Sequence, residues 1–369
     1  MTTAPIQATP ATAQAMINSA VGFPSTTIEL LPGQYPMLRF TGTNVVLIRF
    51  QPGATCGGLS FEGGENPCAN KQIEEPRIEG GGPTYCGISI VDDVSNILIR
   101  RPYVGPGYHR AYGIERADRR WPQPRGITID RLHAEGMVGI GGIVGASDSV
   151  TFHNTTLHCK SCLGGNGAYH HDRQATNLRL TGYFDVYGAN GVPACGIRGG
   201  GAYIENAYVC GCGVNFATGH NTQTIKKLVS VNATLAELGI GGFGPLYIES
   251  AELTNNLPAA QLAGGGPDHH LLKIGTERQK QVQDMIDATT DSAVRAALLQ
   301  IMEPLSRVEI RDLTMRTTAP DSGTNINISA APEYGGVIEV TGSTQARPGP
   351  DLEWGADVQA AWTRLGAGA

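Results

Sequence analysis

Four carboxylates in the middle of the chain are candidates for acid–base chemistry: Asp130, Glu135, Asp172 and Asp185. Hydrolysis of a glycosidic bond needs two such groups, one acting as an acid and the other as a base or nucleophile. Asp130 and Glu135 are close enough in the sequence to share one structural repeat. They are therefore the first pair to consider for a hydrolase.

A second group of side chains could supply the base or the cation of a lyase reaction. It comprises His133, His153, Lys160 and Arg198, and the densest titratable run is His170 to Arg173, HHDR. A lyase removes a proton with such a base while a cation neutralises the acidic sugar. These residues match no catalytic motif, and a histidine beside an aspartate at a turn is more often structural. The sequence assigns no catalytic set and leaves enzyme activity open.

Arginine is concentrated where the chain reads RRPYVGPGYHRAYGIERADRRWPQPR, from Arg100 to Arg125. The stretch has seven arginines, with only Glu115 and Asp118 as acids. Guanidinium groups bind carboxylates and phosphates through paired hydrogen bonds and also stack on aromatic rings. We predict a recognition surface for an acidic glycan or for acidic groups of a neighbouring subunit. Its predicted substrate-binding residues are Arg110, Arg116, Arg119, Arg120 and Trp121.

The segment Ser149–Cys162, SVTFHNTTLHCKSC, combines two histidines, a Cys-x-x-Cys pair and an Asn-x-Thr sequon. A zinc site built on Cys159 and Cys162 would need further ligands, either Cys210 with Cys212 or His170 with His171. One Cys-x-x-Cys without a second pair at matching spacing is a weak signal, so no metal and no cofactor are expected. The eight cysteines are expected to be buried thiols, or disulfides formed after release from a cell.

Composition excludes several classes of protein. Only 16% of the 369 residues are charged, the net charge is −6, and no block of lysine and arginine dominates, so nucleic acid is not expected as a partner. The 50 glycines follow no three-residue period, which excludes collagen. No apolar run approaches the roughly 18 residues of a membrane span. The N-terminal stretch lacks the basic and apolar segments of a secretory signal.

Short strand-like runs that recur along the chain must position these side chains. With Leu98, Thr128, Thr151, Arg179, Ile204, Val229 and Tyr247 as markers, the runs are 18 to 30 residues apart. A single alternating strand cannot bury its apolar face alone, but stacked repeats bury a continuous column. Val150 and Phe152 should therefore point inward, with His153 and His158 outside. The sequon asparagines are expected at turns between strands; they are Asn154, Asn232 and Asn327.

The runs TIELLPGQY, SNILIRR and DSVTFHN resemble those of the right-handed parallel β-helix superfamily, which includes pectate lyases and phage tailspikes. The resemblance covers about residues 26 to 341 and implies an all-β fold, a right-handed parallel β-helix solenoid. It specifies the fold better than the activity, because members include lyases, hydrolases, epimerases and non-catalytic virion parts.

The helical pattern interrupts the strand pattern once. A capping-box sequence at Thr276–Gln279 and two short apolar stripes predict an inserted helical hairpin. The predicted organisation is then an N-terminal cap over 1–25, a β-helix over 26–263, the insert over 264–304, final coils over 305–343, and a C-terminal tail over 344–369.

The function expected from this resemblance is that of a phage virion protein, tailspike-like or a decoration protein. Such a protein would present a rigid surface to a bacterial surface polysaccharide or to other virion subunits. It would be made in the host cytoplasm and work as a homo-oligomer. The alternative is a polysaccharide lyase or hydrolase acting on an acidic glycan.

Overall fold

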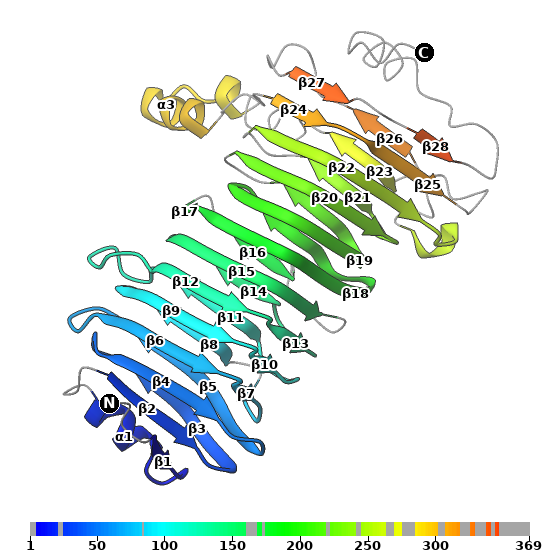
Figure 1. The fold of residues 1–369 in the computed structure, drawn as a ribbon. Coiled ribbons are helices and arrows are strands. Elements are labelled where there is room, and N and C mark those ends of the chain that lie inside the picture. The colour runs from blue at the N-terminus through cyan, green and yellow to red at the C-terminus, as the bar shows by residue number, and fades with distance from the viewer. Residues whose placement is uncertain are drawn as a thin grey trace. The chain divides into compact units, whose positions relative to one another are not determined.

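The computed structural model of the chain is a parallel β-solenoid of about nine turns (Figure 1). All the strand pairings that it describes are parallel, so the predicted all-β solenoid is confirmed. The chain forms two compact units, Met1–Gly188 and Ala189–Ala369. The residues that the structure describes are 5–20, 25–82, 85–159, 168–171, 174–218, 222–240, 245–262, 269–274, 285–301, 307–317, 325–328, 337–340 and 344–346.

In the first unit, each complete coil contributes strands to three parallel sheets. Sheet one contains β2 (Ser25–Leu30), β4 (Val45–Phe50), β6 (Cys68–Glu74), β9 (Val94–Arg100), β12 (Arg125–Asp130) and the first parts of β15 (Ser147–His158) and β18 (Leu178–Gly199). Sheet two contains β7 (Arg77–Ile78), β10 (Tyr103–Val104), β13 (His133–Glu135) and later parts of β15 and β18. Sheet three contains β8 (Cys86–Val91), β11 (Arg110–Glu115), β14 (Gly142–Val144) and β16 (Tyr169–His171). Two longer strands, β3 (Gly33–Phe40) and β5 (Ala54–Glu62), and the short β17 (Ala175–Thr176) complete the unit.

Alternating side chains build the core of this unit, because every second residue of a strand points inward. One register position of sheet one is apolar and fully buried in seven successive coils, at Ile28, Ile48, Ile73, Ile99, Ile129, Phe152 and Leu180. Val150 is also buried, while His153 is exposed and His158 half-buried, as the sequence predicts. Stacked identical positions thus give one continuous hydrophobic column.

Two columns of left-handed residues bend the chain in sheet one, the first near the start of its strands and the second where the chain passes from sheet one to sheet two. The first column, with φ between 52° and 63°, is Asn70, Asn96, Gly126, Ser149 and Asn177. The second, with φ between 52° and 68°, is Glu75, Arg101, Arg131, Asn154 and Gly182. Asparagine and glycine tolerate this conformation best. The turn interpretation of the sequons is confirmed for Asn232 (φ 59°), which lies outside the strands. Asn154 is left-handed but lies inside β15, at the bend between sheets one and two, and Asn327 lies inside a strand, β26 (Asn325–Ile328).

The second unit repeats the pattern with longer strands. Its first strand row contains the early part of β19 (Ala202–Thr218), then β20 (Gln223–Val231), β22 (Leu246–Asn255), β24 (Arg307–Ile310) with β25 (Leu313–Thr317), and β27 (Val337–Val340) with β28 (Thr344–Ala346). Its second row contains the later part of β19, β21 (Ala236–Ile240), β23 (His270–Ile274) and β26. The short η2 (Ala259–Gln261) follows β22.

The repeat markers are correct in the first unit and wrong in the second. Leu98, Thr128, Thr151 and Arg179 are register partners. Ile204, however, pairs with Ile225 rather than with Val229. Val229 is an outward-facing apolar residue between the buried Leu228 and Ser230, so hydrophobicity alone selected the wrong position.

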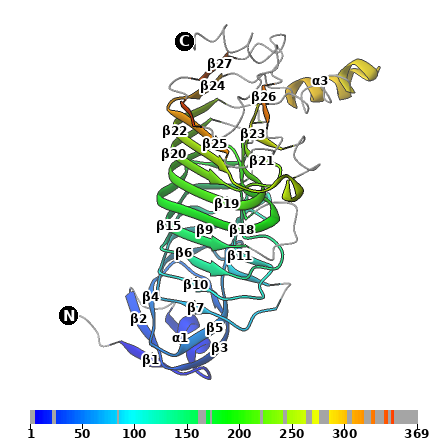
Figure 2. The same cartoon turned by 90° about the vertical axis from the view of Figure 1, so that its right-hand side faces the viewer.

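The strand pairing departs from the predicted boundaries at three places. The stack begins before residue 26, because β1 (Ile6–Ala8) already pairs with β2. Its neighbour α1 (Ala13–Ser19) buries Ala13 and Ile17 beside β2 and β3 (Figure 2). The helical insert cannot begin at 264, because β23 is a coil strand between β21 and β26. The tail from residue 344 opens with β28, which pairs with β25.

One helix of the predicted insert is described, α3 (Ser292–Ile301), with a short helical turn at 285–288 before it. The capping box at Thr276–Gln279 lies outside the described residues, as does the C-terminal segment after residue 346. Among the described helices, none is long and apolar enough to cross a membrane.

Candidate functional site

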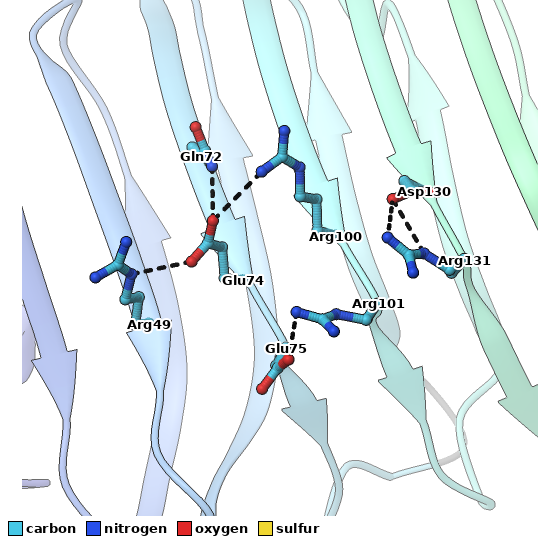
Figure 3. A network of polar contacts seen from close by, with 8 residues as sticks. All are labelled: Arg49, Gln72, Glu74, Glu75, Arg100, Arg101, Asp130 and Arg131. Carbon is cyan, nitrogen blue, oxygen red and sulfur yellow. Dashed lines mark hydrogen bonds and ion pairs between the residues drawn. The ribbon is translucent and has the colours of Figure 1, made fainter.

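Charged side chains alternate along one outward register position of sheet one. The position is occupied by Glu29, Arg49, Glu74, Arg100 and Asp130 in successive coils. Figure 3 shows Glu74 between two guanidinium groups: its Oε2 is 3.0 Å from Arg49 Nε, and its Oε1 is 3.5 Å from the Arg100 Nη1. Opposite charges thus occupy neighbouring coils at this position, and Glu74 is paired on both sides. This charge ladder stabilises register and leaves little unpaired charge for a ligand.

The corner beside this ladder has its own ion pairs. Glu75 and Arg101 pair at 2.5 Å, and Arg131 pairs with Asp130 at 3.1 Å (Figure 3). Asp130 lies on β12 of sheet one, and Glu135 lies on β13 of sheet two. The two carboxylates share a coil as predicted, but they point from different sheets and do not form a catalytic pair.

The predicted arginine surface is largely neutralised by acids of the same chain. Arg110 lies on β11 and approaches Glu115 at 3.6 Å. Arg120 donates to Asp118 at 2.8 Å through Nε and lies 5.8 Å from the centre of the Trp121 ring. Hydrogen bonds from Arg120 lower the pKa of the Asp118 carboxyl.

Arg116 and Arg119 lie in the same loop and make no ion pair among the described residues. The loop is held on the preceding coil, since Asp92 Oδ1 accepts hydrogen bonds from the backbone N–H groups of Ala117 and Asp118 at 2.8 and 2.9 Å. Just beyond it, Arg125 pairs with Asp93 at 3.0 Å. Of the four predicted arginines, Arg116 and Arg119 are thus the two without an ion pair among the described residues.

Sheet two carries a denser cluster, which we call the sheet-two strip: Tyr103, His133, Glu135, His158, Asp185 and Tyr187. Register brings these residues together from four successive coils. His133 stands between Tyr103 and Thr156, and Thr156 pairs with Asp185. Glu135 pairs with His158, which pairs with Tyr187. Side chains that are far apart in the sequence therefore form two adjacent outward columns on the same face.

The rings of the strip stack along the solenoid. Tyr103 and His133 are stacked with centroids 5.8 Å apart, and His158 and Tyr187 are stacked at 4.8 Å. His133 and His158 are tilted at 5.3 Å. Because the ring faces contact each other, the strip presents ring edges outward, with their N–H and O–H groups. Tyr183 lies at the corner next to the strip and is 44% exposed. Its ring face is not stacked on another described ring.

Glu135 is the centre of the polar contacts. Its Oε1 is 2.8 Å from His133 Nε2, and its Oε2 accepts a hydrogen bond of 3.3 Å from the Tyr103 hydroxyl. The contact with His133 lowers the pKa of Glu135. Burial, together with the Glu135 carboxylate, raises the pKa of Tyr103. Burial instead raises the pKa of Asp185, so the two carboxyl groups of the strip are shifted in opposite directions.

The other sequence candidates do not converge. His153 lies on sheet one, with Nδ1 3.0 Å from the Thr181 hydroxyl. His170 lies on sheet three, and Arg198 belongs to the second unit. Lys160, Cys162, Asp172 and Arg173 lie outside the described residues. His133 and Glu135 were both candidates and lie two residues apart on one face of β13, but only the register of the coils adds the two tyrosines and His158.

Seven cysteines are described, and Cys56, Cys68, Cys86 and Cys195 are free thiols. Burial raises the pKa of Cys56, Cys86 and Cys195 to about 12 and that of Cys68 to about 11, so these thiols stay protonated and unreactive at neutral pH. The described residues contain no cluster of three or more His, Cys, Asp or Glu side chains able to hold a metal.

A buried polar network in the second unit has no signal in the sequence. Glu237 is fully buried and accepts hydrogen bonds from Asn215, Ser230 and Asn255 side chains at 2.5 to 2.8 Å, and one from the Ala233 N–H. Burial raises its pKa to about 7 in spite of these donors. Asn255 Nδ2 also lies 3.1 Å from Nε2 of the buried His269. The network is closed to solvent and is structural.

Comparison of the chain with protein-family models found no match, and comparison with the sequences of curated proteins found none either.

Proposed function

We propose that the solenoid binds a glycan along the sheet-two strip. The observation that carries this proposal is the row of half-exposed hydroxyl, imidazole and carboxylate groups on four successive coils. These groups donate to and accept from hydroxyls, which are the main polar groups of a sugar. The free ring face of Tyr183 supplies an apolar contact at the same edge.

A repeating surface favours a repeating ligand. Coils stack about 4.8 Å apart, so equivalent side chains recur at a fixed interval along the strip. A solenoid also needs little reorganisation to bind, which reduces the entropic cost of association. An extended polysaccharide meets both conditions better than a compact small molecule does. We place this binding in the setting expected from the tailspike resemblance, a virion surface that contacts a bacterial polysaccharide.

Binding is tested on a glycan array with the wild type and three variants. Tyr183→Ala and the double variant His158→Ala/Tyr187→Ala should each weaken the strongest signals at least tenfold. The matched control is Tyr85→Ala, which removes another exposed tyrosine, 53% exposed and outside the strip. Equal loss in the control, or no loss in the strip variants, would contradict the proposal.

A second candidate, glycan hydrolysis, is favoured by the opposite pKa shifts of Glu135 and Asp185. Environments that separate two carboxyl pKa values produce an acid and a base. The two residues are two coil steps apart, or roughly 10 Å along the stack, which is closer to the spacing of inverting than of retaining enzymes. Asp185→Asn and Glu135→Gln should then abolish release of reducing ends from a bound polysaccharide while the array signal persists. If the wild type releases none from any polysaccharide it binds, the strip only binds.

A further inference from the structure

The charge of the strip is unbalanced toward the negative side. Among the described residues of this row, the carboxylates are Glu79, Glu135 and Asp185, and the guanidinium is that of Arg77. Arg77 is already paired with Glu79 at 2.8 Å. The two ion pairs of the neighbouring corner, described above, contribute no net charge. Among the residues that the structure describes, Glu135 and Asp185 are therefore left without a neighbouring cationic side chain of fixed charge.

Glu135 keeps capacity for a ligand. A carboxylate has about four acceptor sites, and this one uses one oxygen for His133 and the other for Tyr103. Its side chain is 48% exposed, so the remaining lone pairs face solvent. They accept hydrogen bonds from hydroxyl or ammonium groups, and they repel another carboxylate.

From this geometry, and resting on the glycan-binding function above, we propose that the strip selects neutral or amine-bearing glycan segments and rejects segments rich in uronic acids. Glu135 is the specificity-determining residue, with Asp185 two coils away adding to the same field. This selectivity is the reverse of the one expected from the arginine-rich stretch, whose arginines mostly pair with acids of their own loop and coil.

The test compares three hexasaccharides of equal length by isothermal titration: hexa-glucosamine, hexa-N-acetylglucosamine and hexagalacturonate. The wild type should bind the first two at least tenfold more tightly than the third. Affinity for hexa-glucosamine should also fall with added salt, because charge attraction is screened. Glu135→Gln should weaken hexa-glucosamine binding at least fivefold, change N-acetylglucosamine binding less, and strengthen hexagalacturonate binding.

The control variant is Glu62→Gln, which removes an equally exposed carboxylate from β5. It should leave all three affinities unchanged. If hexagalacturonate binds best, or if Glu135→Gln alters the three affinities equally, the charge selectivity is overturned while glycan binding stands. If no hexasaccharide binds and the strip variants change no array signal, glycan binding itself fails, and the selectivity fails with it.

Discussion

At the scale of the residue, burial decides the ionisation of Glu237 and His269, and it does so in opposite directions. Desolvation disfavours the charged form of any group. It raises the pKa of Glu237 to about 7 and lowers that of His269 to about 4. Both groups are held in the interior of the second unit by Asn255, which contacts each of them. Their effects on stability therefore oppose each other over the same pH range.

Glu237→Gln should remove the fall in folding stability that ionisation of Glu237 causes as the pH rises toward 7 and above. The folded pKa of about 7 exceeds the ordinary value of 4.5, so the folded state holds the proton more tightly and stability falls as pH rises from 4.5 through 7. The shift corresponds to about 3 kcal/mol. Because His269 acts in the opposite direction, urea unfolding at pH 5 and pH 8 should show little net change in the wild type and in the control Glu249→Gln, which alters an exposed carboxylate of β22. Glu237→Gln should instead gain stability from pH 5 to pH 8, since only the His269 effect remains. The same pH dependence in Glu237→Gln and the wild type would contradict the assignment.

His269→Gln tests the effect of His269 on folding stability below pH 6.5. Its folded pKa of about 4 lies below the ordinary 6.5, so the unfolded chain takes up the proton first and stability falls as pH drops from 6.5 toward 4. The variant should be less stable than the wild type at pH 7 because it disturbs the contact with Asn255. Its stability should rise between pH 6.5 and 4.5, since only the Glu237 effect remains, whereas that of the wild type should change little. The same slope in the variant and the wild type would show that His269 does not contribute to the acid sensitivity.

At the scale of the element, left-handed residues bend the strands of sheet one without always ending them. A non-glycine residue costs about 1–2 kcal/mol in this conformation, yet Ser149 adopts it inside β15 with φ 54°. The coil tolerates this because hydrogen bonds and packing of the strand on both sides fix the backbone.

Ser149→Gly should stabilise the first unit by about 0.5–1 kcal/mol, since glycine adopts φ 54° without steric cost. The matched control is Thr151→Gly, two residues along the same strand in extended backbone, which should destabilise it by about 1 kcal/mol. Denaturant midpoints measure both. Destabilisation of similar size in the two variants would mean that the corner is not strained.

Close packing of β14 on β11 gives a second element-level prediction. A Cβ at Gly142 would lie 2.0 Å from the ring carbon Cζ of the buried Tyr112. Gly142→Ala should therefore destabilise the unit by about 2–4 kcal/mol, as overpacking of a rigid core does. The double variant Gly142→Ala/Tyr112→Ala should cost less than the sum of the two single variants. Simple additivity would argue against the clash.

At the scale of the whole molecule, each coil contacts mainly the coils before and after it, so stability is close to a sum of neighbour terms. The strand β23 matters in this respect, because it joins β21 to β26. Removing β23 should open a gap in one strand row of the second unit. Removing α3, which is not part of a strand row, should leave the row continuous.

Two deletions test this distinction. Replacing residues 276–304 with a short Gly/Ser link keeps β23, and should preserve a strand-rich circular dichroism spectrum and hydrogen-exchange protection of β22. Replacing residues 264–304 also removes β23, and should expose β21 and β22 to exchange. Protection in the first unit should be unchanged in both. Identical protection in the two deletions would mean that β23 contributes nothing to the stack.

The sequence by itself determined the parallel coils, the inward position of Val150 and Phe152, and the turn position of Asn232, because alternation and turn chemistry are local properties. It also identified His133 and Glu135 as candidates, and these two residues, two apart on β13, share one face by alternation alone. Only the tertiary structure decided that they lie beside Tyr103, His158 and Tyr187. The reason is register: coils of unequal length place residues side by side that no fixed sequence interval relates. The arginines were predicted to bind a partner, but the fold places Asp92, Asp93 and Asp118 beside that loop and pairs most of its charge within the chain.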